Sequence, residues 1–491
     1  MNLIKISMIG HNYKHELFEL IREFFPKEEI EFIDEQEDIY EALVIFSSLV
    51  ENIDNTFAIA KIFDNQDLIK EIVIDIDKIY INNFPRNMII KNAIKKSIYD
   101  SLIDLIDHDI PWGILTGIRP IKVVHDLMNN NIDSSEIKRI LMNEYRIHEK
   151  KTQLMINIAK SQRKHIYPLD ENKYSLYIGI PFCPSRCSYC SFPAFPIGKN
   201  YDRVSEYVNI LVYEIKEIKK MMEGRILNTV YIGGGTPTSL KIKDLERIIA
   251  TVRDSFKNED IKEFTIEAGR PDTLNLEMLK MLKSMKIDRI SINPQTMNSQ
   301  TLERIGRNHD INSIISSYNM AKDLGFESIN MDIILGLPGE GVDDVAYTLN
   351  EIVKLDPENL TVHTLAIKRG SKLFNRKDNS FKKFKVITDM FSLTESKAAE
   401  MEMFPYYLYR QKQILGNLEN IGYSKPNKEC KYNISMMEEK ETIIGAGLGA
   451  VSKFYYSKEN KINRLPNFKD LKVYSSRIDE LILKKTNMIS R

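Results

Sequence analysis

Residues 177–190 read Tyr-Ile-Gly-Ile-Pro-Phe-Cys183-Pro-Ser-Arg-Cys187-Ser-Tyr-Cys190, a strand-like run followed by three of the chain's four cysteines. Iron–sulfur clusters are normally held by four cysteines, and structural zinc sites close with four ligands. Three thiolates are one ligand short, and a [4Fe–4S] cluster held by three leaves one iron open for a ligand that is not protein. Open metal positions are typical of catalytic sites, so this loop predicts a catalytic metal centre.

Two other interpretations of the cysteines are weaker. Three cysteines cannot pair among themselves as disulfides, and Cys430 lies far along the chain. A zinc site of three cysteines and one histidine would use His165 or His309. Zinc motifs usually present paired C-x2-C knuckles, however, and the C-x3-C-x2-C spacing does not pair that way. Spacing and ligand softness therefore favour an iron–sulfur cluster over zinc.

The composition limits the possible partners. The 491 residues favour two to four domains, and the 69 basic and 69 acidic side chains give a formal net charge of zero. A chain without excess basic charge is not expected to bind nucleic acid or an anionic membrane as a stable partner. The first residues match neither a signal nor a transit peptide, and apolar runs such as 42–50 are too short for stable membrane insertion. With only four cysteines, the expected location is the cytoplasm.

From about residue 173 the chain alternates between strand-like and helix-like patterns. Strands are expected at 174–180, 229–232, 263–268, 289–293, 328–335 and 360–365. Helices are expected between them, at 204–222, 240–256, 275–285, 311–324 and 342–355. Strands joined by crossover helices pair in parallel with right-handed connections. This pattern predicts a full or partial α/β barrel, whose functional residues lie after the carboxyl ends of the strands.

The flanking segments differ from this pattern. Residues 1–165 mix short strands (4–9, 57–63, 72–76) with helices near 17–25 and 88–105, which predicts a separate α+β domain. The barrel is assigned to residues 166–370. Residues 371–491 are expected to form a mainly helical C-terminal domain that packs against it.

A glycine-rich segment follows the second expected barrel strand. It reads Gly233-Gly234-Gly235-Thr236-Pro237-Thr238. Glycines permit close approach of the backbone to a ligand, and Thr238 could cap the next helix. A tight strand–helix turn without a ligand explains the segment equally well by itself. Its place beside the cysteine loop in one barrel favours ligand contact.

Polar residues stand at the ends of, or inside, the later strands. Glu267 could hold an amine or a ribose hydroxyl, and Gln295 could hydrogen-bond a ligand. Arg307 suits a carboxylate. The alternatives are a solvated strand-end charge for Glu267 and a surface helix cation for Arg307. Asp332 lies inside an apolar run, where an aspartate needs a partner or a ligand, whereas His363 is more often a satisfied core histidine.

Together these motifs resemble the radical S-adenosylmethionine (SAM) superfamily. More narrowly, they are similar to the oxygen-independent coproporphyrinogen III oxidase (coproporphyrinogen dehydrogenase) family. The resemblance covers about residues 173–370, with a weaker echo at Gly445-Ala-Gly-Leu-Gly-Ala-Val-Ser452. The N-terminal extension, with Trp112-Gly-Ile-Leu-Thr-Gly-Ile-Arg119-Pro120, looks like the long variant branch of that family.

The resemblance implies a partial (β/α)6 radical SAM barrel and a set of roles. Cys183, Cys187 and Cys190 would bind a [4Fe–4S] cluster, whose open iron takes the amino and carboxylate groups of SAM. The implied SAM contacts are Tyr177, Tyr189, Gly234, Gly235, Thr236, Glu267, Gln295, Arg307 and Asp332. The cluster and SAM would then generate a 5′-deoxyadenosyl radical that abstracts hydrogen from the substrate. An electron donor protein and a porphyrinogen or haem-like small molecule are the implied partners.

Phe192 departs from the pattern of the biosynthetic oxidases. They carry a fourth cysteine two residues after the triad, where this chain has Phe192. The Cys-x-Phe ending is similar to the related haem chaperones, which bind haem and lack oxidase activity. The N-terminal sequence also shows no match to the oxidase's own N-terminal arm.

The leading hypothesis is therefore oxidative decarboxylation of coproporphyrinogen III to protoporphyrinogen IX without oxygen, a step of haem biosynthesis. The alternatives are a haem chaperone on the same scaffold, a radical SAM enzyme with another substrate, and a zinc-stabilised binding module.

Overall fold

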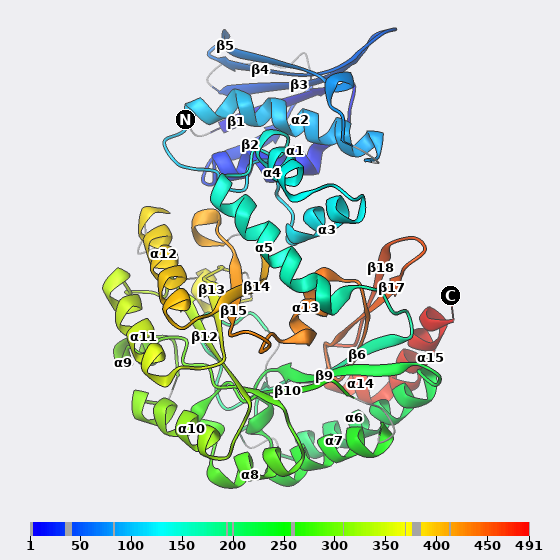
Figure 1. Ribbon diagram of the computed structural model, residues 1–491, viewed down its shortest axis with the longest axis vertical. Coiled ribbons are helices and arrows are strands. Elements are labelled where there is room, and N and C mark those ends of the chain that lie inside the picture. Colours follow the sequence, from blue (N-terminus) through cyan, green and yellow to red (C-terminus); the bar gives the residue numbers. More distant parts are fainter. Residues whose placement is uncertain are drawn as a thin grey trace. The chain divides into compact units, whose positions relative to one another are not determined.

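A computed structural model describes residues 3–34, 42–81, 84–192, 195–198, 201–256, 261–307, 309–368, 370–375, 384–411 and 414–490 (Figure 1). The chain divides into two compact units, Met1–Lys160 and Ser161–Arg491. The three-domain division expected from the sequence, with boundaries after residues 165 and 370, stays a prediction.

The first unit is built on a five-stranded sheet with the order β2-β1-β3-β4-β5. β1 pairs in parallel with β2 and β3, and β3, β4 and β5 pair antiparallel. Along β4 the side chains of Ala58, Ala60 and Ile62 are buried in alternation, as one covered sheet face requires. The strands are β1 (Leu3–Ile9), β2 (Glu29–Phe32), β3 (Leu43–Glu51), β4 (Thr56–Asp64) and β5 (Asp67–Asp75). The helices are α1 (Lys14–Phe24), α2 (Arg86–Leu102), α3 (Ile121–Asn129), α4 (Ser134–Asn143) and most of α5 (Glu149–Ile166). The α+β character expected for this region is confirmed.

The second unit contains the six expected parallel strands, which neighbour one another in chain order. They are β6 (Lys173–Ile180), β9 (Ile226–Gly234), β10 (Glu263–Glu267), β11 (Arg289–Ser291), β12 (Ser328–Leu335) and β13 (Asn359–Thr364). A short parallel pair, β7 (Phe182–Cys183) and β8 (Phe195–Pro196), follows β6. The predicted α/β architecture is confirmed, and all these strands present their carboxyl ends at the same edge of the sheet.

Crossover helices connect these strands. They are α6 (Tyr201–Met221), α7 (Ile242–Ser255), α8 (Leu276–Ser284), α9 (Ser299–Arg304), α10 (Ile311–Asp323) and α11 (Val342–Leu355). In α7 the buried apolar residues are Leu245, Ile248, Ile249 and Val252, the three-and-four spacing of one helix face. No helix of the described residues is long and apolar enough to span a bilayer.

The C-terminal segment extends the barrel sheet on both sides. β15 pairs antiparallel with β13, and β16 pairs in parallel with β6, giving eleven strands in the order β14-β15-β13-β12-β11-β10-β9-β6-β16-β17-β18. Within the described residues no pairing joins β14 to β18. The strands are β14 (Phe404–Tyr409), β15 (Asn420–Ser424), β16 (Thr442–Ala446), β17 (Val451–Tyr456) and β18 (Lys461–Pro466). The helices are α12 (Phe384–Glu400), α13 (Lys431–Glu438), α14 (Leu471–Ser476) and α15 (Ile478–Ile489). The expected helices of this segment are present, and its five strands extend the barrel sheet.

A fully buried ion pair holds the C-terminal helix in place. Lys485 of α15 and Glu214 of α6 are both inaccessible to solvent, and Lys485 Nζ lies 2.6 Å from Glu214 Oε1. Glu214 Oε2 also accepts hydrogen bonds from the Tyr474 hydroxyl (2.5 Å) and the Gly447 N–H (2.7 Å). Each charge therefore has several partners, which is the condition under which a buried pair is tolerated.

The same network reaches the strand that leads into the cysteine loop. The Tyr207 hydroxyl accepts from the Leu448 N–H at 3.2 Å and donates to the Gly179 carbonyl in β6. The Tyr207 ring also meets the Phe182 ring edge-on, with centroids 5.4 Å apart. The end of β6, directly before Cys183, is thus braced by residues from the far end of the chain.

Replacing Lys485 by methionine is expected to lower the free energy of unfolding by about 3–5 kcal/mol, because Glu214 would remain buried without its cation. The neighbouring Lys484→Met is the matched control. Lys484 is half exposed and pairs with exposed Glu480, so its loss should change stability by less than about 1 kcal/mol. Denaturant unfolding of the full chain measures both, and equal effects of the two variants would contradict a structural role for the buried pair.

Candidate functional site

A cavity of ≈ 400 Å³ opens at the carboxyl ends of β9, β10, β11, β12 and β13, beside the cysteine loop that follows β6. Eleven of the twelve residues predicted for the site line it. They are Cys183, Cys187, Cys190, Tyr189, Gly234, Gly235, Thr236, Glu267, Gln295, Arg307 and Asp332. The twelfth, Tyr177, lies behind the wall. Its ring stacks on Tyr231 and Tyr432, with centroids 6.2 and 6.3 Å away.

The cysteine loop is anchored to the neighbouring strand–helix turn. The N–H of Gly235 donates to the Ile180 carbonyl at 2.8 Å, and the N–H of Thr236 donates to the Phe182 carbonyl at 2.7 Å. The Thr236 hydroxyl lies 3.4 Å from Cys183 Sγ. A Cβ on Gly235 would stand 3.0 Å from the same sulfur. The glycine turn therefore forms a cradle for the cysteine loop.

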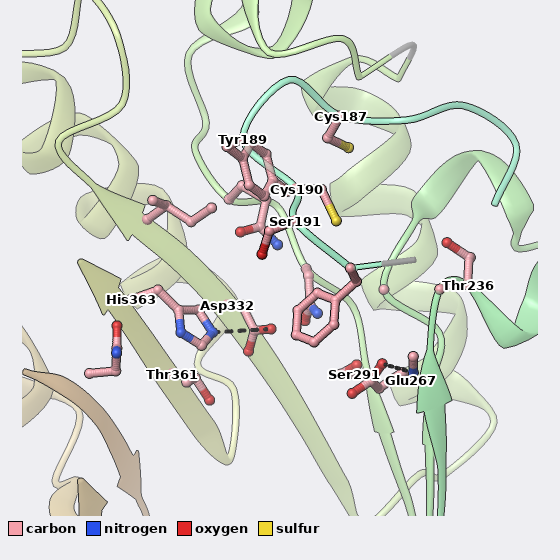
Figure 2. A pocket seen from close by; sticks show the side chains of 18 of the residues that line it. Cys187, Tyr189, Cys190, Ser191, Thr236, Glu267, Ser291, Asp332, Thr361 and His363 are labelled. Carbon is pink, nitrogen blue, oxygen red and sulfur yellow. Dashed lines mark hydrogen bonds and ion pairs between the residues drawn. The ribbon is translucent and has the colours of Figure 1, made fainter. Parts of the chain in front are cut away.

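Burial raises the pKa of the Cys183 and Cys190 thiols, and the neighbouring cysteines add to the shift. A thiol whose pKa is raised loses its proton less readily, unless a metal ion replaces the proton. Figure 2 shows Cys187 and Cys190 on one side of the cavity and Asp332 with His363 on the other. Space for a ligand therefore lies between the thiols and a polar wall.

In the part of the chain that the structure describes, the zinc interpretation finds no histidine ligand beside the cysteines. Among the described residues, no three His, Cys, Asp or Glu side chains converge on one metal position. Neither histidine of the zinc interpretation lines this cavity. His165 lies 4.0 Å from Glu429, and His309 lies 3.6 Å from Asp272.

The Glu267 carboxylate is held by two donors. Its Oε1 accepts from the Tyr231 hydroxyl at 2.7 Å, and its Oε2 accepts from the Gly234 N–H at 3.0 Å. The left-handed φ of Gly234, 109°, turns this N–H toward the carboxylate. Burial raises the pKa of Glu267, and the two donors oppose that shift. The carboxylate is positioned to meet a cationic or hydroxyl group of a ligand.

Replacing Tyr231 by phenylalanine is expected to shift the acidic limb of the pH–activity profile to higher pH. The hydroxyl lowers the pKa of Glu267, so its removal raises that pKa further. The ionised carboxylate is lost as pH falls through the pKa, and in the variant this occurs at higher pH. SAM cleavage measured across pH should therefore fall several-fold at the acidic end. Tyr432→Phe removes a hydroxyl without a hydrogen-bond partner, and an equal shift in that variant would contradict this role of Tyr231.

Arg307 lies buried beside the cysteines. Its guanidinium donates to the carbonyls of Asn293 (2.8 Å) and Gly269 (3.1 Å) and to the Tyr189 hydroxyl (3.2 Å). Arg307 Nε, Asn293 Oδ1 and Ser291 Oγ are buried and belong to residues that line the cavity, and they have no hydrogen-bond partner among the residues that the structure describes. Buried polar atoms are rarely left unsatisfied, so this wall fits a polar ligand such as SAM. Gln295, nearby, has a left-handed φ of 68°.

The opposite wall combines Asp332 with His363, for which a place in the core was the expectation, and with residues that the sequence did not single out. His363 Nε2 lies 3.7 Å from Asp332 Oδ2, and the Tyr409 hydroxyl lies 3.4 Å from His363 Nδ1. His363 thus lines the cavity and is not a core histidine. Lining residues that sequence reasoning missed are Arg186, Lys368, Tyr407, Tyr409, Gln411, Asn420 and Asn433. Most come from the segment after β13, which carries no recognisable motif.

Comparisons with known proteins agree with this geometry. The Radical SAM superfamily model matches residues 177–352. The chain is 43% identical over 378 residues to the oxygen-independent coproporphyrinogen-III oxidase-like protein HemZ of Bacillus subtilis (strain 168), across 75% of each chain. It is 31% identical over 277 residues to the haem chaperone HemW of the same organism. That alignment covers 56% of this chain and 70% of HemW.

A solved structure shares the fold. It is coproporphyrinogen III oxidase (HemN) from Escherichia coli, described as a radical SAM enzyme. It superimposes with a TM-score of 0.52 at 23% identity, covering 66% of this chain and 72% of that chain.

Proposed function

The chain belongs to the radical SAM superfamily and, within it, to the HemN/HemZ-like family, and from this membership we propose that it is an anaerobic coproporphyrinogen III oxidase. The family implies a [4Fe–4S] cluster and SAM as cofactors. The finer proposal is that the substrate is coproporphyrinogen III and that two propionate side chains become vinyl groups.

The observation that carries this proposal is the composition of the wall opposite the cysteines. Tyr231, Tyr407 and Tyr409 offer aromatic surface to pyrrole rings. Arg186 and Lys368 line the same cavity and suit propionate carboxylates.

The chain's own residues would have these roles. Cys183, Cys187 and Cys190 hold the cluster, and Glu267, Gln295, Arg307, Asp332, Tyr189 and the Gly234–Thr236 turn hold SAM, with Tyr177 supporting the wall from behind. When bound, the cluster and SAM supply a 5′-deoxyadenosyl radical that removes one hydrogen atom from a propionate side chain. The side chain then loses CO2 and one electron, which passes to an acceptor outside the protein. The protein excludes water and orients the side chain.

We further propose an electron donor protein as partner and the cytoplasm as location. The four cysteines are free thiols, which suits a reducing compartment.

A haem chaperone is the second candidate, and Phe192 favours it. Phe192 lines the cavity and is 62% exposed, so its ring is available to a flat apolar ligand. The identity to the haem chaperone HemW supports the same possibility.

Anaerobic incubation of the reconstituted protein with reductant, SAM and coproporphyrinogen III separates the two candidates. The oxidase yields protoporphyrinogen IX, detected by mass after oxidation to the porphyrin. Stoichiometric haem binding without any vinyl product would overturn the oxidase and support the chaperone.

A further inference from the structure

Arg270 connects the cysteine loop to the turn that follows β10. It stands three residues after the end of that strand and lines the cysteine cavity, yet it is only 4% exposed. Pro271 follows it, and a residue before proline favours an extended backbone, as the φ of −127° and ψ of 112° of Arg270 show. The Arg270 carbonyl accepts from the Thr273 N–H at 3.0 Å and from the Thr273 hydroxyl at 2.8 Å. The backbone that carries Arg270 is therefore fixed by its own turn.

One side of the Arg270 guanidinium is occupied by a carboxylate. Its Nε and Nη2 donate to the two oxygens of Asp272 at 3.0 and 2.7 Å. This two-pronged geometry is the one in which an arginine binds a carboxylate most firmly. Burial by itself would raise the pKa of Asp272, but His309 and Arg270 beside it lower that pKa below its usual range. Asp272 therefore stays ionised and holds the guanidinium in one orientation.

The remaining guanidinium nitrogen reaches the middle of the cysteine loop. Arg270 Nη1 donates to the Ser185 carbonyl at 3.2 Å and to the Ser185 hydroxyl oxygen at 2.9 Å. Ser185 lies midway between Cys183 and Cys187 in the sequence. Its hydroxyl donates in turn to the Gly306 carbonyl at 3.3 Å. The carbonyl and the hydroxyl of this serine are thereby tied to two neighbouring turns of the barrel.

Other hydrogen bonds to the loop lack either the charge or the burial of the Arg270 contact. The Ser188 N–H donates to the Ile305 carbonyl at 3.0 Å, without a charged partner. Arg186 Nη2 donates to the Gly370 carbonyl at 2.7 Å, but Arg186 is exposed. A hydrogen bond with an ionised donor is stronger than a neutral one, and shielding from water strengthens it further. Among these contacts, loss of Arg270 should therefore loosen the loop most.

We propose that Arg270, oriented by Asp272, is a positioning residue of the cluster site that fixes the spacing of Cys183 and Cys187 through Ser185. Ligands that are placed before the metal arrives lose less conformational entropy on binding it. A fixed loop should therefore release its cluster more slowly than a loose one. The proposal rests on the cluster that the family implies and not on coproporphyrinogen III as substrate, so it can be tested whether or not the oxidase reaction occurs.

Alkylation of the apo-protein by iodoacetamide measures the loop before any cluster binds. Cys187 is 8% exposed and Cys430 is 2% exposed, so both should react slowly in the wild type, with each site followed by mass spectrometry. In Arg270→Ala the loop opens more often, and the alkylation rate of Cys187 should rise by about tenfold, the effect of losing a hydrogen bond to a charged group. Cys430 lies outside the cavity and should keep its wild-type rate, which makes it the internal control for the fold.

Iron release from the cluster-loaded protein gives a second readout. Arg270→Ala should lose iron to a chelator about tenfold faster than the wild type. Guanidinium chloride at a low, non-denaturing concentration can occupy the space left between Asp272 and Ser185 and should restore slow release. Urea has a similar shape without the charge and should not restore it. Arg270→Lys keeps the charge but cannot hold Asp272 and Ser185 at once, so it should cause the same changes at about threefold.

Arg253→Ala is the matched control. Arg253 also donates to backbone carbonyls, those of Met285 and Lys286, but it does not line the cysteine cavity. Its loss should leave Cys187 alkylation and iron release within about twofold of the wild type. Unchanged alkylation and iron release in Arg270→Ala and Arg270→Lys would overturn the proposal. An equal rise at Cys430 would also overturn it, because Arg270 would then support the whole fold, and so would equal rescue by urea.

Discussion

Replacing Cys187 by alanine abolishes both the absorbance of the iron–sulfur cluster and the reductive cleavage of SAM. Cys187 is buried in the centre of the loop, and in the proposed site each of the three thiolates would hold one iron. Substitution of a residue that only hydrogen-bonds to a metal ligand already lowers metal affinity or activity by about 10–100-fold. Loss of a ligand itself should therefore lower SAM cleavage at least about a hundredfold. Iron and sulfide content, visible absorbance and 5′-deoxyadenosine formation measure the effect.

The control is the fourth cysteine. Cys430 is buried outside the cavity, and its Sγ donates to Glu263 Oε1 at 3.2 Å. Cys430→Ser keeps this hydrogen bond and should retain the full iron content. A Cys187→Ala protein with wild-type iron content, or a Cys430→Ser protein without iron, would show that the cluster is held elsewhere.

Replacing Gly235 by alanine is expected to reduce cluster content by about tenfold or more. Adding a methyl group to a site that is already tightly packed has an effect of this size. The new Cβ would stand 2.5 Å from the Phe182 carbonyl oxygen, 2.9 Å from the Ile180 carbonyl oxygen and 3.0 Å from Cys183 Sγ. Two of these atoms are backbone carbonyl oxygens, which cannot rotate away as the end of a flexible side chain could. The loop and its cysteine must therefore move away from the position that binds iron.

Gly117→Ala is the matched control, because a Cβ there meets no atom within 4 Å. It should leave iron content and SAM cleavage unchanged. Iron quantified after anaerobic reconstitution, beside a thermal melt of each variant, separates loss of the site from loss of the fold. Wild-type iron content in Gly235→Ala would contradict the close packing of turn and loop.

The barrel and the cysteine side of the site could be predicted because their signals are local. Each parallel strand is a short apolar run, and its functional residue follows it within a few positions, as Glu267 does at the end of β10. The placement of Tyr177 illustrates the limit of such reasoning. The family resemblance implied that Tyr177 contacts SAM, but its ring packs behind Tyr231.

The opposite wall could not be predicted, since it depends on pairings between distant segments. β15 joins β13 antiparallel, and this pairing brings Asn420 and Tyr409 beside His363. The Lys485–Glu214 pair joins residues from α15 and α6, and no local pattern reveals either partner. Burial of a charged side chain is decided by tertiary packing, so a sequence alone cannot identify it.

The most direct test of the proposed reaction is a hydrogen-transfer experiment. Coproporphyrinogen III is deuterated at the propionate carbon attached to the ring and incubated anaerobically with the cluster-loaded protein, reductant and SAM. The expected result is deuterium in the 5′-deoxyadenosine, together with vinyl product. Unlabelled 5′-deoxyadenosine with intact propionates would contradict radical abstraction from this substrate.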